Sequence, residues 1–369
     1  MNSKINGHHS HHSQTSVGKN AVFLIHSRDQ QDIDQRFKLS KFFPASWTDF
    51  TLSRLPGRMG LTLCDQVKLP NGAMLYLLGV LLKPHQIISD KRSVVAAARS
   101  RILRAARFAQ SRLDAGVIGL GALTVSATNG GRWLVEQPGI TARITHGDAF
   151  ATVIALEGIE KVLLMTGLKK PLIAVIGAYG IIGSAVCRSL AAQHDLLMIG
   201  RSPTKLEKLR HQLGDRVRAS GDIHSIRLAD VVVSATSNPG PFIQSQTLKP
   251  HAVIYDIAQP SSIDPKLLNE RPDLICIDGS LAKTPGVKVK FDMRTGRDAT
   301  FACLAETVLK TLEGIDGHHV GEIDLDYIDQ IRAIGQKHRF KHADFTEFGN
   351  VVCAERFQAS FCGRKRLGS

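Results

Sequence analysis

The chain has 369 residues, of which 43% are hydrophobic and 22% charged; these are globular values that exclude wholesale disorder, and the length suffices for two domains. Its 47 Lys and Arg residues against 33 Asp and Glu give a formal charge of +14, which favours an acidic or phosphorylated partner. The apolar runs are shorter than the roughly 20 residues of a membrane span, which argues against integral membrane association. The six cysteines include no CxxC pair, which argues against a disulfide framework and a zinc ribbon and predicts a cytoplasmic location.

The first 19 residues, MNSKINGHHSHHSQTSVGK, are low in complexity and rich in histidine. They lack the apolar stretch of a secretory signal, and we expect them to be disordered. His8, His9, His11 and His12 are able to chelate a metal ion, but a flexible tail lacks the second shell of partners that holds functional ligands in place. We therefore predict no metal site.

The first ordered elements are expected to be strands. The apolar run Ala21–Ile25 predicts a short strand, and Met74–Leu82 predicts a longer one that ends before Pro84. Residues 46–72, with scattered glycine and proline, predict loops and short strands between them.

Residues 91–112 have a helical pattern with seven basic residues and no acidic one. Arg92, Arg99, Arg104 and Arg107 fall close together around this helix. Such a face is either a solvated surface or a docking surface for an acidic partner, and the absence of acids keeps both interpretations open.

The stretch that follows leads into a second unit. Residues 116–131 are rich in glycine, a loop is expected at residues 146–148, and residues 149–167 predict a helix.

A dinucleotide-binding loop follows a buried strand. The continuous apolar run Leu172–Ile176 predicts a parallel strand, and GAYGIIGS and a helical stretch come directly after it. In this setting Gly177 permits the tight turn, Gly180 lets a pyrophosphate approach the backbone, and Gly183 lets the helix lie close to the strand. The cofactor-binding residues predicted from this loop are Gly177, Tyr179, Gly180, Ile181, Ile182 and Gly183.

The residues after the next strand distinguish an NAD site from an NADP site. An NAD enzyme has Asp or Glu there to bind the ribose hydroxyls, but Leu196–Ile199 is followed by GRSPTK, without a carboxylate. Arg201, Ser202 and Lys205 suit a 2′-phosphate instead, so we predict NADPH as the cofactor. Further parallel strands are expected at residues 231–234, 253–256 and 274–278, and the predicted cofactor site also includes Ala235 and Thr236.

Of the six cysteines, Cys303 has the setting that best suits a nucleophile. Cys187 and Cys276 lie in apolar stretches and are expected in the core. Asp298 and Thr300 signal a helix start, which places Cys303 in the first turn, where the helix dipole can lower the pKa of a thiol. Cys303 also lies opposite the apolar stripe of this helix, so we expect it to face away from the core. An incidental surface or interface thiol is the alternative.

These motifs resemble a known family, the cyanobacterial-type long-chain acyl-[acyl carrier protein] reductases. The similarity covers roughly residues 90–340 and is strongest in LGALT at 120–124, GAYGIIGSAVCR at 177–188 and FACLAE at 301–306. The resemblance implies that Cys303 is the acylated cysteine and that Arg201 matches the family's cofactor arginine. It further implies NADPH-dependent reduction of a fatty acyl thioester, on acyl carrier protein or CoA, to a fatty aldehyde. An acidic acyl carrier protein would suit the +14 charge.

The expected fold class is α/β, with a Rossmann-like parallel-sheet NADP domain and a second α/β substrate domain formed by the N-terminal part and the C-terminal helices. The expected division is a disordered tail at 1–19, a substrate (acyl) domain at 20–167, an NADP-binding domain at 168–299, C-terminal helices with the nucleophilic Cys303 at 300–345, and a tail at 346–369.

Two other functions stay open. An NADP-dependent dehydrogenase of a free small molecule, shikimate- or amino-acid-like, would keep the NADP domain and form no covalent intermediate. A non-catalytic NADP-binding regulator would use the positive charge to hold nucleic acid, but the sequence has no helix-turn-helix signature and only 6% aromatic residues. We therefore expect no nucleic-acid partner.

Overall fold

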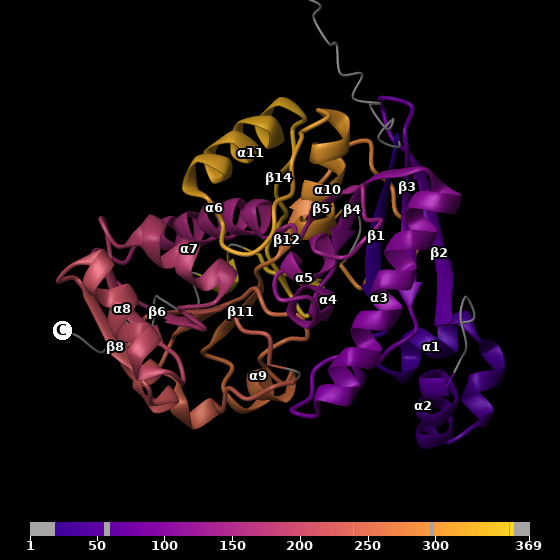
Figure 1. Cartoon of the computed structure of the whole chain (residues 1–369). Coiled ribbons are helices and arrows are strands. Elements are labelled where there is room, and N and C mark those ends of the chain that lie inside the picture. The colour runs from indigo at the N-terminus through magenta and orange to yellow at the C-terminus, as the bar shows by residue number, and fades with distance from the viewer. Residues whose placement is uncertain (1–18, 55–59, 239, 296–298, 354, 358–369) are drawn as a thin grey trace, which may run out of the picture.

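A computed structural model describes residues 19–54, 60–238, 240–295, 299–353 and 355–357. Two α/β domains lie side by side, with helices of the C-terminal part above and between them (Figure 1). The expected fold class, α/β with a parallel-sheet cofactor domain, is confirmed. The four clustered histidines of the N-terminal tail lie outside the described residues.

The N-terminal domain is built on a five-stranded sheet in the order β2-β3-β1-β4-β5. All neighbouring strands pair in parallel except β2 and β3, which are antiparallel. Helix α3 (Arg92–Leu113) buries four of its six alanines against one face of this sheet, and two later helices, α6 and α10, cover the other face. The strands are β1 Asn20–His26, β2 Leu61–Lys68, β3 Met74–Val80, β4 Ala115–Leu120 and β5 Arg143–Thr145.

None of the helices in the described part of the chain is long and apolar enough to cross a bilayer. Short helices lie between the strands of the N-terminal sheet. They are α1 Gln30–Arg36, η1 Lys38–Phe42, α2 Ala45–Arg54, η3 Pro84–Gln86, α4 Leu123–Ala127 and α5 Arg132–Val135.

The cofactor domain contains a six-stranded parallel sheet in the order β11-β10-β9-β6-β7-β8, the strand order of dinucleotide-binding domains. The inner strands are mainly apolar because both faces of the sheet are covered by helices, whereas the edge strand β8 has the sequence VRAS and only its first residue is buried. The strands are β6 Leu172–Ile176, β7 Asp195–Ile199, β8 Val217–Ser220, β9 Val231–Ser234, β10 Val253–Asp256 and β11 Ile275–Asp278. The covering helices are α7 Ile181–Leu190, α8 Pro203–Leu213, η4 Ile223–Leu228, η5 Ser245–Thr247 and α9 Lys266–Glu270.

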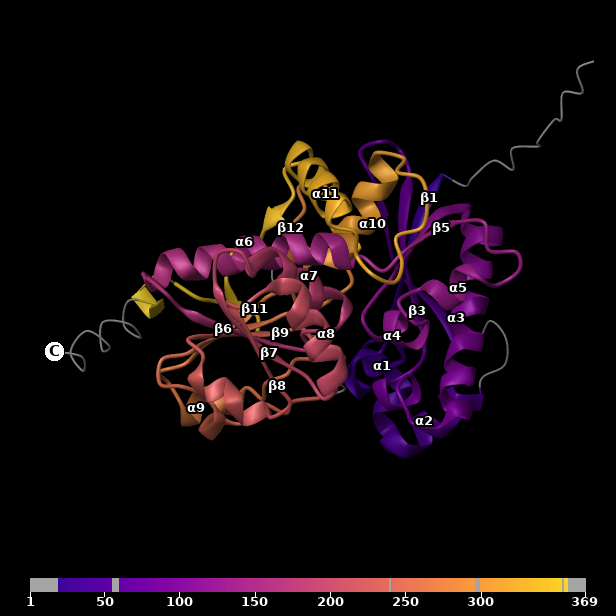
Figure 2. The same cartoon turned by 60° about the vertical axis from the view of Figure 1, so that its left-hand side comes forward.

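Helix α6 (Asp148–Thr166) takes part in both hydrophobic cores. Its first half lies against α10 (Ala302–Leu312) and α11 (Leu325–Lys337), and its second half lies on the cofactor sheet. Figure 2 shows α6 crossing above the cofactor sheet toward α10 and α11. The shared helix therefore sets the position of α10 relative to the cofactor domain.

The C-terminal part adds two small antiparallel sheets. In the first of them, a strand ends directly before α10 and so fixes the start of that helix. The strands of the two sheets are β12 Leu281–Lys283, β13 Ala299–Phe301 and β14 Lys341–His342, then β15 Thr346–Glu347 and β16 Asn350–Val351.

Residues 46–72 differ from the expected loops and short strands, because they contain most of α2 and all eight residues of β2. An irregularity between Leu63 and Asp65 interrupts the alternation of buried and exposed side chains in β2. Helix α2 leaves large apolar side chains exposed. Neither element therefore has the hydrophobic period that reveals a strand or helix in a sequence.

Candidate active site

A cavity of about 1070 Å³ lies where the cofactor domain meets the N-terminal domain and the start of α10. This volume is at the upper end of the range for ligand pockets, which is about 300–1,000 Å³. The cavity brings together cofactor residues and the cysteine that the sequence singled out separately. Those in its wall are Gly177, Tyr179, Gly180, Ile181, Ile182, Arg201, Ala235, Thr236 and Cys303.

The glycine loop between β6 and α7 fits a pyrophosphate. Gly177 has a φ of 79°, and a Cβ added to it would lie 2.5 Å from the carbonyl oxygen of Ala235. Gly180 precedes α7 without a side-chain cap, so backbone N–H groups at the helix start are free for an anion. Gly183 does not line the cavity; its Cα lies so close to the Gly177 backbone that a Cβ would meet the Gly177 oxygen at 2.2 Å.

The three residues predicted to hold a 2′-phosphate have different surroundings. Arg201 is exposed and lines the cavity. Ser202 caps α8 by accepting the Lys205 N–H at 3.4 Å, and its own N–H donates to the Tyr179 hydroxyl at 3.2 Å. The Lys205 ammonium lies over the Tyr179 ring, 5.4 Å from its centre. Only Arg201 of the three lines the cavity.

Asp222 and His224 also line the cavity, although no motif marks them in the sequence. They follow β8, the strand next to β7, so they share the carboxyl edge of the sheet with Arg201. The Asp222 carboxylate accepts the His224 N–H at 2.9 Å. The signal that reveals such residues is their place after a parallel strand, where α/β sheets bind ligands.

Cys303 is the second residue of α10, in the first turn as expected. The helix begins at Ala302 because Thr300 belongs to β13, and Asp298 lies outside the described residues. The expectation that Cys303 faces away from the core is wrong. Its side of the helix also carries Glu306, Thr307 and Lys310, and all three are fully buried. Helix α10 is covered on both sides, and Cys303 is half-buried in the cavity wall.

The expected lowering of the thiol pKa is likewise wrong for the free chain. Burial, followed by the nearby charge of Asp148, raises the pKa of Cys303 to about 12. The backbone N–H groups of Leu304 and Cys303 itself act in the opposite direction, as a helix start should. Desolvation outweighs this dipole effect because the thiolate loses its hydration in the cavity wall.

The loop at residues 146–148 lies directly against Cys303. Gly147, with a φ of 75°, approaches so closely that a Cβ would be 2.4 Å from the Cα of Cys303. His146 accepts the Asp148 N–H at Nδ1 (3.0 Å) and donates from Nε2 to the Gly321 oxygen (3.2 Å). Burial lowers the pKa of His146 and raises that of Asp148 to about 7. A neutral imidazole and a carboxyl that titrates near neutrality therefore share the cavity wall with the thiol.

A buried polar network holds α10 one turn beyond Cys303. The Glu306 carboxyl accepts the Thr145 hydroxyl at 2.5 Å and the Phe150 N–H at 2.7 Å, and burial raises its pKa. Lys310 donates to the Ile315 oxygen and to His319 Nδ1, each at 2.9 Å, and burial lowers its pKa to about 8. These bonds tie α10 to β5, α6 and the following loop, so they fix where Cys303 stands.

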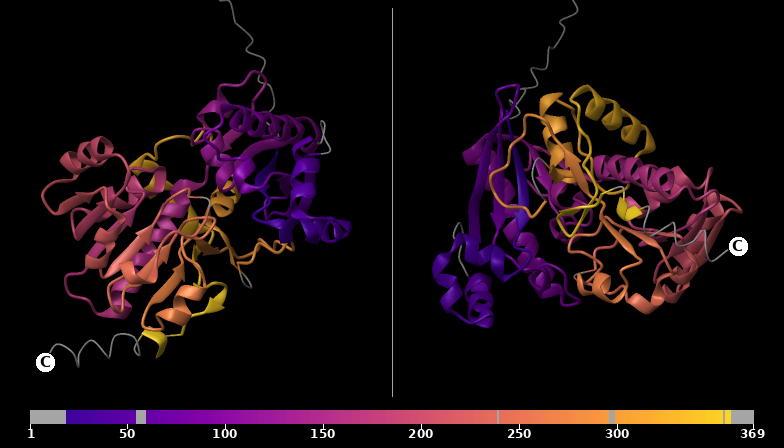
Figure 3. Two further views of the ribbon diagram at one scale, coloured as in Figure 1. Left: turned by 90° about the horizontal axis from the view of Figure 1, so that it is seen from below. Right: turned by 180° about the vertical axis from the view of Figure 1, so that it is seen from behind.

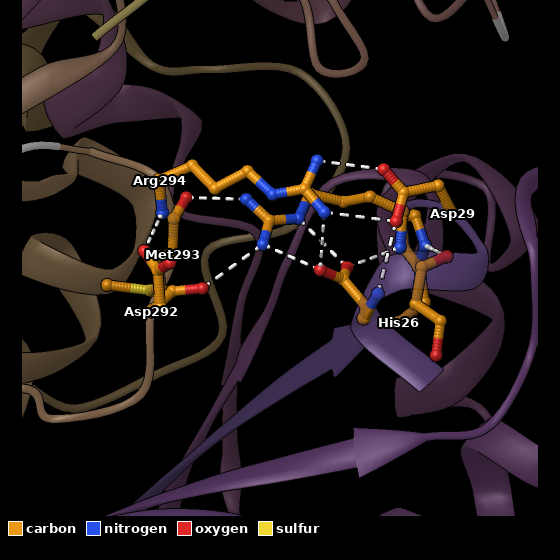
Figure 4. Close-up of polar contacts among 8 residues, drawn as sticks. His26, Asp29, Asp292, Met293 and Arg294 are labelled. Carbon is orange, nitrogen blue, oxygen red and sulfur yellow. Dashed lines mark hydrogen bonds and ion pairs between the residues drawn. The ribbon is translucent and has the colours of Figure 1, made fainter. Parts of the chain in front are cut away.

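A group of ion pairs lies beside the cavity, and two of its members, Arg28 and Asp32, line the cavity wall. Figure 4 shows the polar contacts of this group. Arg28 binds Asp32 through two nitrogens, at 2.9 and 2.8 Å, and donates to the Met293 oxygen at 2.5 Å. Arg294 binds Asp29 at 2.8 and 3.0 Å and Asp32 at 3.1 Å. These pairs fasten the loop before α10 to the start of α1. The apolar wall on this side includes Phe23, Ile25, Ile88, Leu123, Val125, Phe291, Met293 and Phe301.

Ser280 presents a polar atom to the same cavity. Its residue is 7% exposed, and its hydroxyl has no hydrogen-bond partner within the described ranges. The Ser280 carbonyl accepts the Ala302 N–H at 2.9 Å, so the hydroxyl stands next to the start of α10. An orphaned buried hydroxyl in a cavity wall is typical of a group that bonds to a ligand.

One family model and two known proteins are similar to parts of this chain. The family model described as shikimate / quinate 5-dehydrogenase matches residues 161–278, which hold the glycine loop and most of the parallel sheet. Aminotransferase PigE of a Serratia strain is 26% identical over 254 residues, 65% of this chain and 29% of that protein. Long-chain acyl-[acyl-carrier-protein] reductase of Synechococcus elongatus is 27% identical over 205 residues, 53% of this chain and 59% of that protein.

Two solved structures align with much of this chain at low identity. L-tryptophan dehydrogenase from Nostoc punctiforme aligns over 95% of this chain and 91% of its own, with 13% identity and a TM-score of 0.39. D-isomer specific 2-hydroxyacid dehydrogenase from Lactobacillus delbrueckii aligns over 68% and 75%, with 11% identity and a TM-score of 0.28. The family match and the parallel sheet together indicate an oxidoreductase-like domain for a nicotinamide cofactor, and the resemblance to acyl-carrier-protein reductases has support at 27% identity.

Proposed function

We propose that the chain is an NADPH-dependent reductase that converts a fatty acyl thioester to a fatty aldehyde through an acyl-enzyme on Cys303. One observation carries the proposal: the cavity that holds the glycine loop also holds Cys303, and no other cysteine of the described residues lines it. The apolar side chains of the N-terminal domain and of the loop before α10 give the same cavity a wall that suits an acyl chain.

The cofactor assigned to the cavity is NADPH. The free N–H groups after Gly180 suit the pyrophosphate, and Arg201 is the cation at the end of β7, where no carboxylate lies between Gly200 and Lys205. When bound, NADPH supplies the hydride that reduces the acyl group.

The acyl group is first transferred to Cys303. Its sulfur attacks the thioester carbonyl, the carbon–sulfur bond to the carrier breaks, and the carrier leaves as a thiol. With the pKa of Cys303 at about 12, the thiol must give up its proton during the attack, and Asp148, with a pKa of about 7, lies in the same wall to accept it. The N–H groups at the start of α10 are placed to stabilise the carbonyl oxygen. Release of the aldehyde returns Cys303 to a thiol.

The proposed acyl donor is an acidic acyl carrier protein that meets the basic helix α3. Arg92 and Arg107 are exposed on this helix. Arg99 and Arg104 are half-buried, and Arg99 donates to the Ala127 oxygen at 2.7 Å and stacks over Trp133 at 5.2 Å. Arg107 donates to the Pro138 oxygen at 3.0 Å but stays exposed. The docking surface we propose therefore depends mainly on Arg92 and Arg107, with charge complementarity as its basis.

A second candidate is a dehydrogenase of a free small molecule. The match of residues 161–278 to the shikimate / quinate 5-dehydrogenase model favours it. In this case Asp148 and His146 would handle the proton of a hydroxyl substrate, and Cys303 would have no chemical role.

Substrate-dependent NADPH oxidation separates the two candidates. We expect NADPH oxidation with long-chain acyl-carrier protein or acyl-CoA, with aldehyde as the product, and no reduction of NADP+ when shikimate or quinate is the substrate. Cys303→Ser should bind NADPH and form no aldehyde, because a hydroxyl is a poor nucleophile near neutral pH. Cys353→Ser is the matched control, since Cys353 is exposed and does not line the cavity. Shikimate oxidation by the Cys303→Ser variant would favour the second candidate.

A further inference from the structure

The segment from Phe37 to Phe50, which we name the aromatic knob, carries a dense group of exposed apolar side chains. It comprises η1 and the first part of α2, and it lies with α1 at the end of the N-terminal domain that is remote from β8 and α8 (Figures 1 and 3). Every exposed aromatic side chain of the described residues belongs to it. The exposed fractions are Phe37 42%, Leu39 74%, Phe42 81%, Phe43 54%, Trp47 66% and Phe50 57%.

These side chains are exposed although the knob is anchored. Ile33, Leu52 and Leu81 form a small buried cluster that joins it to the N-terminal sheet. The buried Arg101 guanidinium donates to the Leu81 oxygen at 3.0 Å and also to the Leu52 oxygen. The apolar side chains therefore face outward from a fixed backbone. Several large apolar side chains exposed within one short anchored segment are typical of an interaction surface.

The residue composition of the aromatic knob indicates what kind of surface it binds. Exposed Lys38 and Lys41 alternate with the apolar residues in FKLSKFF, and the Asp34 carboxylate beside them already accepts from the Ser40 hydroxyl and the Gln30 amide. Aromatic rings that sit among lipid headgroups, with lysines that reach the phosphates, are the composition of membrane-interface segments. The net charge of +14 adds long-range attraction to an anionic surface.

We propose that the aromatic knob inserts into the headgroup region of an anionic lipid bilayer and holds the chain there as a peripheral protein. The knob is continuous with the cavity wall, because Asp32 of α1 lines the cavity and α1 is fastened by Arg28 and Arg294 to the loop before Cys303 (Figure 4). When the aromatic knob is inserted among the lipid headgroups, one side of the cavity therefore lies close to the lipid surface. The inference concerns the surface alone and does not depend on the proposed reaction.

Tryptophan fluorescence tests insertion directly, since Trp47 and Trp133 are the only tryptophans in the chain. Trp133→Phe leaves Trp47 as the single reporter. On addition of mixed phosphatidylglycerol and phosphatidylcholine vesicles we expect its emission to move to shorter wavelength and to resist an aqueous quencher. Pure phosphatidylcholine vesicles should give a much smaller change, and salt should weaken the anionic response. An unchanged emission with anionic vesicles would refute insertion.

Vesicle flotation of the full chain gives the second test. Phe42→Glu and Leu39→Glu should each weaken partitioning by more than about tenfold, because each removes an apolar side chain that would enter the bilayer and adds a charge that the anionic lipid repels. Leu164→Glu is the matched control, since Leu164 on α6 is 77% exposed but lies outside the knob. Equal loss in the control would overturn the proposal. So would a change from dimer to monomer in sedimentation for the knob variants without any vesicle binding, because the knob would then be an interface between two copies.

Discussion

Replacing Asp148 with asparagine should stabilise the fold, and increasingly so as the pH rises. Burial raises the pKa of Asp148 from 3.8 to about 7, and its side chain is only 14% exposed, so solvent screens it little. The folded chain then holds a proton that the unfolded chain releases, and stability falls as the pH rises from about 4 to about 7. Three pKa units correspond to about 4 kcal/mol. The neutral amide removes this cost.

The stabilisation by Asp148→Asn should depend on pH, because it follows the protonation of the Asp148 carboxyl. At pH 8 the full cost of about 4 kcal/mol is present, whereas at pH 5 the wild-type carboxyl is still protonated in the folded state and the cost is about 2 kcal/mol. Asp148→Asn should therefore raise the free energy of unfolding at both values, by about 2 kcal/mol more at pH 8.

Guanidinium denaturation at the two pH values measures this difference. Asp326→Asn is the control, since Asp326 also lies in the first turn of a helix, α11, but is exposed. We expect it to change stability little at either pH. An effect of Asp148→Asn that does not grow between pH 5 and pH 8 would show that the carboxyl is not held protonated in the cavity wall.

Three further predictions concern ligand binding. Arg201→Ala should weaken NADPH about 10- to 150-fold, the loss of a charge-assisted bond to phosphate, and leave NADH nearly unchanged in calorimetry; equal loss for both would remove the 2′-phosphate role. Gly180→Val should fold but fail to bind NADPH, because a branched side chain fills the pyrophosphate path, and unchanged affinity would move the site elsewhere. Replacing Arg92 and Arg107 with glutamate should raise KM for acyl carrier protein at low salt and leave KM for acyl-CoA unchanged. The control Lys208→Glu, at an exposed position of α8, should change KM for neither substrate. Equal increases of KM for both substrates would show that α3 has a structural role and does not dock the carrier.

The cofactor domain could be predicted from the sequence almost completely. Its inner strands are buried on both faces and are apolar runs, so the strands expected at Leu172–Ile176, 231–234 and 253–256 have those bounds in the structure. The edge strand β8, which is largely exposed, has no apolar run and is not among the predicted strands. The glycine loop between Gly177 and Gly183 has a fixed spacing because strand, turn and helix all constrain it.

The reactive end of the cavity could be predicted only in part. Cys303 was found from its place in a helix start, but Asp148 and His146 carry no motif, and they meet it only because α6 lies against α10. The error about which way Cys303 faces has the same origin. A polar stripe on a helix predicts a solvated face, whereas Glu306 and Lys310 are buried because Thr145 and His319 satisfy their hydrogen bonds.

The central claim is that Cys303 carries the acyl group. The most direct test is the intact mass of the protein after incubation with long-chain acyl-CoA or acyl-carrier protein in the absence of NADPH. We predict a mass increase of one acyl group, mapped to the peptide that contains Cys303, absent in Cys303→Ser and discharged as aldehyde when NADPH is added. An unmodified mass under conditions in which added NADPH yields aldehyde would contradict the account, because the hydride would then reach a bound substrate without a covalent intermediate.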